Sequence, residues 1–387
     1  MGTITLLSRS PSCRRTCCVG VGRFERRRRK ATGVGWMRRK LRDLGFSIGT
    51  LPTGERNQVT DVPGVRVGHV TIREDMNERT VIRTGVTAVL PHGGNWFLEK
   101  VPAACFVLNG FGKTVGLVQV EELGLIESPI MLTNTFSVGA VWQGTLEYML
   151  AMTPEIGDTT GSANIVVGEC NDSYLNTARA LSVTKEHAKE AIAAARVEME
   201  EGEVGAGTGM MCFGWKGGVG SSSRVVSRGY TVGALVVSNF GRREELRFVP
   251  YVPPSFDERD VPAGSIMMIV ATDAPLDARQ LKRLAKRAAV GLARTGSHVH
   301  HGSGDIVIAF STAYTVPHFV DSAHQALPPL VRDDAPLMNE LFQAAVEATE
   351  EAIWNSLTMA ETTTGRNGRV GEAIPYSLLR WIKWTEK

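Results

Sequence analysis

The sequence lacks several features that would assign a function at once. No run approaches the ~18 consecutive apolar residues that a membrane-spanning helix needs. The six cysteines show no CxxC pair, which argues against a disulfide scaffold or a zinc module and favours a reducing compartment. A complete GxGxxG fingerprint and a GxxxxGKS/T loop are both missing, so a nucleotide site is disfavoured. No internal repeat is present, which argues against a solenoid.

Acidic residues are nearly absent from the N-terminal head of the chain. Residues 1–42 hold thirteen basic residues and a single acidic one, Glu25, while the whole chain carries a net charge of +3. The other residues therefore sum to −9, and we expect no nucleic-acid surface on this acidic body. The head also lacks the apolar segment of a secretory signal. We interpret residues 1–40 as a disordered tail or an extended translation start, with an Arg-rich transit peptide as the alternative, and we expect a cytoplasmic protein.

The body contains an alternation of apolar strands and amphipathic helices. Hydrophobic residues make up 43% of the 387-residue chain, which is enough for a large core. The expected strands cover residues 86–90, 165–167, 230–238, 266–271 and 306–310, with a Pro63-Gly64 turn between two further short strands in 59–69. The expected helices cover residues 115–123, 138–152, 184–201, 277–294, 338–359 and 377–385. This alternation predicts α/β layers.

A glycine-rich stretch lies in the middle of the chain. Residues 202–220 hold eight glycines together with Lys216. The pattern is too loose for a phosphate-binding motif, so we interpret it as a loop that permits close backbone approach. Lys216 has no role that the sequence assigns.

A histidine cluster is the candidate metal site. His298, His300 and His301 lie close to Asp305 in the sequence, and imidazole and carboxylate groups can bind a metal ion. They occupy an apparent loop without partners at a fixed spacing. We therefore favour a solvated, hydrogen-bonding loop, and we expect neither a metal nor a cofactor.

Short motifs that follow one another in order along the body decide the interpretation. They are VTDVPGVRVGH at 59–69, RTGVT at 83–87, VGE at 167–169, DSYLN at 172–176, GAGTGM at 205–210, KGGVGSSSR at 216–224, VVSN at 236–239, GSIMMIVATDAPL at 264–276, and GSGD at 302–305 with AFST at 309–312. Together they resemble the DmpA-type aminopeptidases, the family of L-aminopeptidase/D-esterases and β-peptidyl aminopeptidases. The resemblance covers nearly the whole body, which makes it far more specific than any single motif.

The resemblance implies both a fold and a maturation step. The fold is a four-layer αββα sandwich of the DmpA/ornithine acetyltransferase type, related to the N-terminal-nucleophile hydrolases. Members are made as inactive precursors that cut themselves before a serine or threonine. Here the cut would fall between Gly264 and Ser265, dividing a single domain, 41–387, into an α chain, 41–264, and a β chain, 265–387. A homotetramer of cleaved protomers is also implied.

Such a cut would create the base that the reaction needs. A serine hydroxyl is a weak nucleophile until a base takes its proton. Once Ser265 is N-terminal, its α-amine has a reference pKa of ~7.7–8.0, against ~10.4 for lysine, and covalent geometry holds it within reach of the hydroxyl. Before the cut the same nitrogen is an amide. Gly264 suits the scissile position because glycine tolerates the strained backbone of an N→O acyl shift.

The resemblance also implies roles for five further residues. Ser303 and Asp305 would complete the hydrogen-bond network of the nucleophile, and Asn239 would donate to the oxyanion of the tetrahedral intermediate. Glu169 would pair with the free ammonium of the substrate, and Asn171 would contribute to substrate binding. This chain departs from the family pattern at two of these positions: Asp305 stands where the compared members carry Glu, and Asn171 stands where some members carry Tyr.

The predicted function is a self-processing serine aminopeptidase or amidase. It would release N-terminal L-, D- or β-residues from short peptides, amides or esters, without nucleic-acid or membrane partners. One alternative is an acyltransferase like the ornithine acetyltransferases, although these use a Thr nucleophile where this chain has Ser265. The other is an uncleaved, non-enzymatic binding scaffold, which the joint presence of Ser265, Ser303, Asp305 and Asn239 disfavours.

Overall fold

The computed structural model describes residues 38–77, 79–255, 257, 264–320 and 322–379. The expected basic head, up to residue 37, and most of the expected helix 377–385 lie outside these residues. Within the described part, no helix is long and apolar enough to cross a membrane. The described chain begins with residues that contact the body, because the Arg38 guanidinium donates to the carbonyls of Leu357 (3.3 Å) and Ile374 (3.2 Å).

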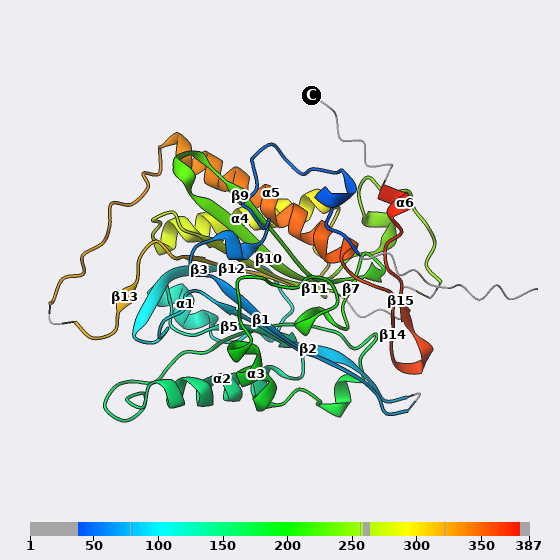
Figure 1. Ribbon diagram of the computed structural model, residues 1–387, viewed down its shortest axis with the longest axis horizontal. Helices are drawn as coiled ribbons and strands as arrows, with labels where there is room; N and C mark the ends of the chain where they lie inside the picture. Colours follow the sequence, from blue (N-terminus) through cyan, green and yellow to red (C-terminus); the bar gives the residue numbers. More distant parts are fainter. Residues whose placement is uncertain (1–37, 78, 256, 258–263, 321, 380–387) are drawn as a thin grey trace, which may run out of the picture. The chain divides into compact units, whose positions relative to one another are not determined.

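Two β-sheets form the centre of the described body (Figure 1). The four-stranded sheet has the order β1-β2-β5-β6, with β1 (Arg66–Asp75), β2 (Val81–Leu90), β5 (Ile130–Asn134) and β6 (Val166–Cys170). The larger sheet has the order β13-β3-β12-β11-β10-β9, with β13 (Val316–Pro317), β3 (Glu99–Gly110), β12 (Gly304–Ser311), β11 (Ser265–Thr272), β10 (Thr231–Asn239) and β9 (Gly218–Val225). A short strand, β4 (Leu125–Ile126), pairs with β3. Most neighbours are antiparallel, but β11 runs parallel to β12, and β5 parallel to β6.

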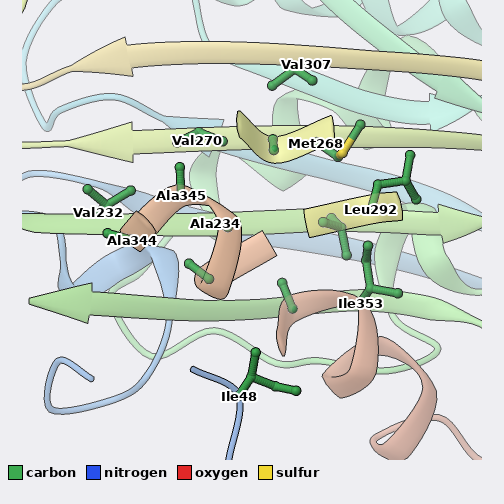
Figure 2. Packing of buried hydrophobic residues seen from close by; sticks show 14 of the residues in the cluster. Ile48, Val232, Ala234, Met268, Val270, Leu292, Val307, Ala344, Ala345 and Ile353 are labelled. Atoms are coloured by element: carbon green, nitrogen blue, oxygen red, sulfur yellow. The ribbon is translucent and has the colours of Figure 1, made fainter. Parts of the chain in front are cut away.

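Helices cover the outer face of each sheet. α2 (Val138–Met152) and α3 (Lys185–Ala193) pack on the four-stranded sheet, while α4 (Ala278–Thr295) and α5 (Pro336–Thr358) pack on the larger one. Three apolar layers separate the four structural layers: one between the sheets and one beneath each helix pair. Figure 2 shows Ala344 and Ala345 of α5 beside Val232 of β10, and Leu292 of α4 near Met268 of β11. The predicted αββα sandwich is confirmed.

The sequence of β11 shows why a central strand of this sandwich is apolar on both faces. Ile266, Met268 and Val270 belong to the core beneath α4 and α5. The alternate residues, Met267 and Ile269, belong to the core between the two sheets. Successive side chains of a strand point to opposite faces, so a strand buried on both sides becomes a continuous hydrophobic run.

Several expected elements differ in the structure. Residues 59–61 form a 3₁₀ turn, η2 (Val59–Asp61), instead of a strand, and the backbone N–H of Val59 donates to the hydroxyl of Ser221 (2.7 Å). The helix expected over 184–201 ends at Ala193, because Arg196 instead pairs its backbone with Val67 at the sheet edge. The helix expected from residue 115 begins at α1 (Leu117–Leu123).

The glycine-rich stretch 202–220 is more regular than the expected loop. It contains η4 (Gly205–Gly207), a hairpin of β7 (Met211–Cys212) and β8 (Trp215–Lys216), and the first residues of β9. Gly220 lies against α5, where an added Cβ would come within 2.0 Å of the carbonyl oxygen of Ala352. Small residues on β9 therefore allow α5 to pack closely on the sheet.

The contact between β9 and α5 also holds a buried ionic cluster. The fully buried Arg224 pairs with Glu347 (Nε to Oε2, 3.1 Å) and with Glu351 (Nη2 to Oε2, 2.6 Å). The remaining guanidinium N–H groups reach the hydroxyl of Ser222 (2.8 Å) and the carbonyl of Ile48 (2.8 Å), among other acceptors. A buried guanidinium is tolerated because its donors are satisfied.

Candidate active site

Strand pairing brings the expected site residues together. Ser265 is the first residue of β11, and in the sheet it stands between Asn239 of β10 and Gly304 of β12. Ser303 and Asp305 flank Gly304 in the sequence, so the parallel pairing of β11 with β12 places them next to the same strand end. The two segments are far apart in the sequence, and only the tertiary fold makes them neighbours.

Two N–H donors converge on the hydroxyl of Ser265. The backbone N–H of Asn171 approaches Ser265 Oγ at 3.2 Å, and Asn239 Nδ2 approaches it at 3.4 Å. The backbone N–H of Met211 donates to Asn239 Oδ1 (2.9 Å), which turns the amide nitrogen of Asn239 towards Ser265. Ser265 itself is only 4% exposed. Donors fixed in a buried site can stabilise negative charge that develops on a reacting oxygen.

Ser303 and Asp305 form a buried pair. The Ser303 hydroxyl donates to Asp305 Oδ1 (2.9 Å), while Asp305 Oδ2 is buried and has no hydrogen-bond partner among the described residues. Burial raises the pKa of Asp305 to about 6, and the bond from Ser303 opposes this shift. In the described part of the uncut chain, no hydrogen bond joins this pair to Ser265.

The peptide unit before Ser265 is confined. The Gly264 carbonyl oxygen accepts a hydrogen bond from the Gly304 backbone N–H (3.2 Å). A Cβ added at Gly264 would lie 2.6 Å from the Cα of Phe240 and 2.8 Å from the carbonyl oxygen of Asn239. Lack of space therefore requires glycine at this position, and the Gly304 N–H polarises the carbonyl that Ser265 would attack.

Glu169 and Asn171 lie at the end of β6, but they present different groups to the site. Glu169 is buried, and it accepts hydrogen bonds from the Lys113 backbone N–H (2.9 Å) and from the hydroxyl of Thr135. The side chain of Asn171 turns into its own loop, where Oδ1 accepts from the Ser173 backbone N–H (3.0 Å). Asn171 thus contacts Ser265 through its backbone rather than through the side chain.

The chain matches a known protein family over most of its length. The family model described as peptidase family S58 matches residues 57–371 of the chain.

The chain belongs to peptidase family S58.

Relatives of this S58 peptidase cover most of its length. The β-peptidyl aminopeptidase BapA of Sphingosinicella microcystinivorans is 40% identical over 370 residues, which span 89% of this chain and 91% of the relative. The PH0078 protein from Pyrococcus horikoshii OT3, in its crystal structure, is 50% identical with a TM-score of 0.82, covering 89% of this chain and 98% of its own. The L-aminopeptidase D-Ala-esterase/amidase from Ochrobactrum anthropi, described as a prototype for the serine aminopeptidases and a variant of the Ntn hydrolase fold, is 36% identical with a TM-score of 0.82, covering 88% and 97%.

These relationships confirm the expected family, fold and enzyme class. This S58 peptidase is a hydrolase, a serine aminopeptidase with the Ntn-hydrolase fold. Two of these relatives are named as aminopeptidases, which favours hydrolysis over the alternative of acyl transfer and over a non-enzymatic scaffold.

The site also contains groups that the sequence did not point to. The backbone N–H groups of Asn171 and Met211 contact Ser265 and Asn239 through their position alone, so no residue type signals them. Asn109 on β3 donates its amide to the carbonyls of His300 (3.1 Å), His301 (3.0 Å) and Ser303. An Asn at the end of an apolar strand was the available signal, but it has too many structural explanations to be recognised.

Lys216 binds backbone carbonyls close to the site. It is fully buried, its ammonium donates to the carbonyls of Gly207 (3.0 Å) and Gly217 (2.7 Å), and burial lowers its pKa to about 7. Lys216 belongs to the β7–β8 hairpin, which also carries Met211 and thereby the N–H that orients Asn239. The lysine thus stabilises the hairpin next to Asn239.

Proposed function

We propose that this S58 peptidase cuts its own chain between Gly264 and Ser265 and then uses Ser265 as its N-terminal nucleophile. The observation that carries the proposal is the position of Ser265 at the buried start of β11, with its hydroxyl facing N–H donors of Asn171 and Asn239. The preceding carbonyl is held by Gly304, and no side chain fits at Gly264.

The cut follows from the chemistry of this peptide unit. Ser265 Oγ attacks the carbonyl carbon of Gly264, the proton of the hydroxyl moves to the departing nitrogen, and the peptide becomes an ester. Negative charge develops on the Gly264 oxygen during the attack, next to the Gly304 N–H. Water then hydrolyses the ester, leaving a carboxylate on Gly264 and a free α-amine on Ser265.

The products of the cut form the catalytic machinery. The α-amine of Ser265 takes the proton of its own hydroxyl, and Oγ attacks the substrate carbonyl. The C–N or C–O bond of the substrate breaks, the new ammonium returns the proton to the departing amine or alcohol, and water hydrolyses the resulting acyl-enzyme. We assign Asn239 Nδ2 and the Asn171 backbone N–H as donors to the oxyanion. Asp305 Oδ2 has no described hydrogen-bond partner in the uncut chain, and we assign the Ser303–Asp305 pair to orienting the new amine.

The substrate carries a free amino group at its N-terminus. We assign Glu169 as the carboxylate that pairs with the ammonium, because it is buried at the end of β6, two residues before the Asn171 N–H that faces Ser265. The relatives are named for β-peptidyl, L-aminopeptidase and D-Ala-esterase or amidase activities. We therefore propose short peptides, amides or esters with an N-terminal L-, D- or β-residue as the substrate class.

Intact mass tests the processing step. The purified wild-type chain is expected to yield a fragment of 123 residues that begins with Ser265, whereas Ser265→Ala is expected to remain uncut and inactive. Ser238→Ala is a matched control, because this neighbouring buried hydroxyl faces Ser356 instead (2.6 Å). Fragments of mature length from Ser265→Ala would overturn the proposal. Hydrolysis of amino-acyl anilides without acetyl transfer from acetylornithine to glutamate would separate hydrolase from acyltransferase.

We also propose a homotetramer of cleaved protomers and a cytoplasmic location. Large apolar side chains that are more than half exposed support an assembly: Phe111, Val118, Leu123 and Phe136. The described cysteines, Cys105, Cys170 and Cys212, are free thiols, as in proteins of reducing compartments. Light scattering of the processed protein tests the assembly, and cell fractionation tests the location.

A further inference from the structure

A second cluster of chemically active side chains lies outside the site around Ser265. Glu245 ends the turn η6 (Arg243–Glu245), and His298 and His300 belong to the loop that follows α4. Glu245 Oε1 lies 2.6 Å from His300 Nε2 and 3.8 Å from His298 Nδ1. One nitrogen or oxygen atom from each of the three side chains lies within 4.8 Å of the others. We propose that this cluster is a binding site for Zn²⁺, in addition to the solvated, hydrogen-bonding loop that the sequence led us to expect.

The donor set fits zinc. Two imidazole nitrogens and one carboxylate oxygen are common zinc ligands, and the distance between two ligand atoms of a tetrahedral site is about 3.4 Å. The separation of Glu245 from His298 is close to that value, whereas the pair Glu245–His300 is shorter because a hydrogen bond joins it. Zinc would replace the hydrogen between the two groups, with the imidazole of His300 neutral and protonated on Nδ1. The distance between Glu245 Oε1 and His300 Nε2 would then lengthen by about 1 Å.

The surroundings hold the cluster ready for an ion. The second carboxylate oxygen of Glu245 accepts from the backbone N–H of Arg242 (3.1 Å), which fixes the orientation of the ligand oxygen. The Arg247 backbone N–H donates to the Thr295 carbonyl (3.0 Å), so the two segments that supply the ligands are tied together. Glu245 is 6% exposed, while His298 is 72% exposed and leaves a route for the ion and a fourth position for water.

The backbone between the two histidines is strained. Val299 has a φ of +54°, in the left-handed region that a β-branched residue rarely adopts. This conformation turns the chain so that both imidazoles face one carboxylate. Strain of this kind persists where a structure needs a particular geometry, and a shared ligand position for His298 and His300 supplies that need.

The cluster is connected to the loop that carries Ser303. The His300 carbonyl accepts hydrogen bonds from the Ser303 backbone N–H (2.9 Å) and from Asn109 Nδ2 (3.1 Å). An ion that fixes His300 therefore also fixes the turn that leads to Ser303 and Asp305. Zinc would act as a positioning ion for this turn, and this consequence, unlike the binding itself, rests on the proposed function.

Calorimetric titration with ZnCl₂ tests the binding in the full chain carrying Ser265→Ala, where every molecule is uncut. We expect saturation at about one ion per chain, and His298→Ala to weaken binding by at least about tenfold. His301→Ala is the matched control and should leave the affinity unchanged, because His301 lies in the same loop but outside the cluster. Absence of binding, or equal affinity of His298→Ala and the parent, would overturn the site.

Two further measurements separate the site from its consequence. Co²⁺ in place of Zn²⁺ should give the intense visible absorption of a tetrahedral site, and His298→Ala should lose this absorption. In the processed wild-type enzyme, a chelator should lower kcat with little change in KM, and this loss should be absent from His298→Ala. If kcat does not respond while zinc still binds, the positioning role is wrong and the site remains; if the enzyme is never processed, only the proposed function fails.

Discussion

Two buried polar clusters lie on the same sheet, and they differ in how completely their groups are paired. Around Arg224, the guanidinium nitrogens and the carboxylates of Glu347 and Glu351 have close partners. Around Ser265, the hydroxyl receives long hydrogen bonds of 3.2 and 3.4 Å, and Asp305 keeps one buried oxygen without a described partner. A saturated cluster contributes to the stability of the fold, whereas an unsaturated one has groups left to bind charge that arises during a reaction.

The largest effect is expected from breaking the saturated cluster. Arg224→Met leaves two buried carboxylates without their main cation, which should lower the free energy of unfolding by about 3–5 kcal/mol. Urea denaturation in the Ser265→Ala background measures this loss on a single chain. Arg42→Met is the matched control, because Arg42 pairs with Glu351 (2.8 Å) from a partly exposed position and should cost much less. Equal losses from both variants would show that the buried ion pairs of Arg224 stabilise the fold no more than the partly exposed pair of Arg42.

Removing a donor from the unsaturated cluster should affect the reaction more than the fold. Asn239→Ala deletes the Nδ2 donor, and we expect kcat to fall by about 10²–10³, which corresponds to about 2.7–4 kcal/mol of transition-state stabilisation. The rate is measured per mole of processed chain, so that slower processing is not counted as slower catalysis. An Asn239→Ala enzyme with a normal kcat but a large loss of stability would show that Asn239 stabilises the fold and takes no part in catalysis.

The titration of Asp305 provides a pH test of whether the cluster around Ser265 is incompletely paired. Its pKa rises from 3.8 to about 6 in the folded, uncut chain, so the native state holds this proton more tightly than the unfolded state. The associated stabilisation is fully present below pH 3.8 and is lost as the pH rises through 6, by about 3 kcal/mol in total. Asp305→Asn in the Ser265→Ala background should flatten this decline in urea unfolding between pH 4.5 and 7.

A surface carboxylate gives the control of opposite sign. Hydrogen bonds from Gln280 and Arg279 lower the pKa of the exposed Asp333, so its contribution is lost as the pH falls instead. Asp333→Asn should therefore change stability only at the acidic end of the range. If Asp305→Asn behaved in the same way, Asp305 would be ionised and paired in the uncut chain, and the unsaturated character of its cluster would be disproved.

The helices and strands of this fold were predictable from the sequence where a single hydrophobic pattern, that of a buried strand or of an amphipathic helix, dominates. The apolar run at 266–271 and the amphipathic helix at 277–294 match β11 and α4 closely, and Asp277 caps α4 by accepting from the Gln280 N–H (2.7 Å). Residues 59–61 and the strands within 202–220 were missed, because short segments are shaped by contacts with distant residues such as Ser221. Local pattern carries little information about such contacts.

The candidate site was predictable from side chains and not from backbone. Ordered motifs pointed to Ser265, Asn239, Ser303 and Asp305, and sheet pairing then explains why they meet. The Met211 N–H, by contrast, acts through a group that every residue except proline carries. The proposed zinc cluster could not be derived from the histidine loop alone for a related reason: its carboxylate, Glu245, comes from a separate segment of the chain.

Glu169 shares features with both clusters, since it is fully hydrogen-bonded but lies near Ser265. Of the substitutions considered, its substitution is expected to have the smallest free-energy effect. Both carboxylate oxygens already accept hydrogen bonds, from the Lys113 N–H and from Thr135, as in a saturated cluster. If Glu169 also pairs with the substrate ammonium, Glu169→Gln should lower kcat/KM, mostly through KM, by a factor that corresponds to about 1.5–3 kcal/mol. The amide oxygen can still accept from the Lys113 N–H and the amide nitrogen can donate to the Thr135 hydroxyl, so the main loss is the charge.

A substrate without a charged amino group distinguishes a structural role of Glu169 from a role in substrate binding. Wild-type enzyme should favour free-amine substrates over their N-acetylated counterparts, and Glu169→Gln should reduce that preference because the charged partner of the ammonium is gone. Steady-state rates on one matched pair of substrates are sufficient. An unchanged preference combined with a lower unfolding free energy would assign Glu169 to the structural class with Glu347. A reduced preference at unchanged stability would show that a fully hydrogen-bonded carboxylate can still recognise substrate through its charge.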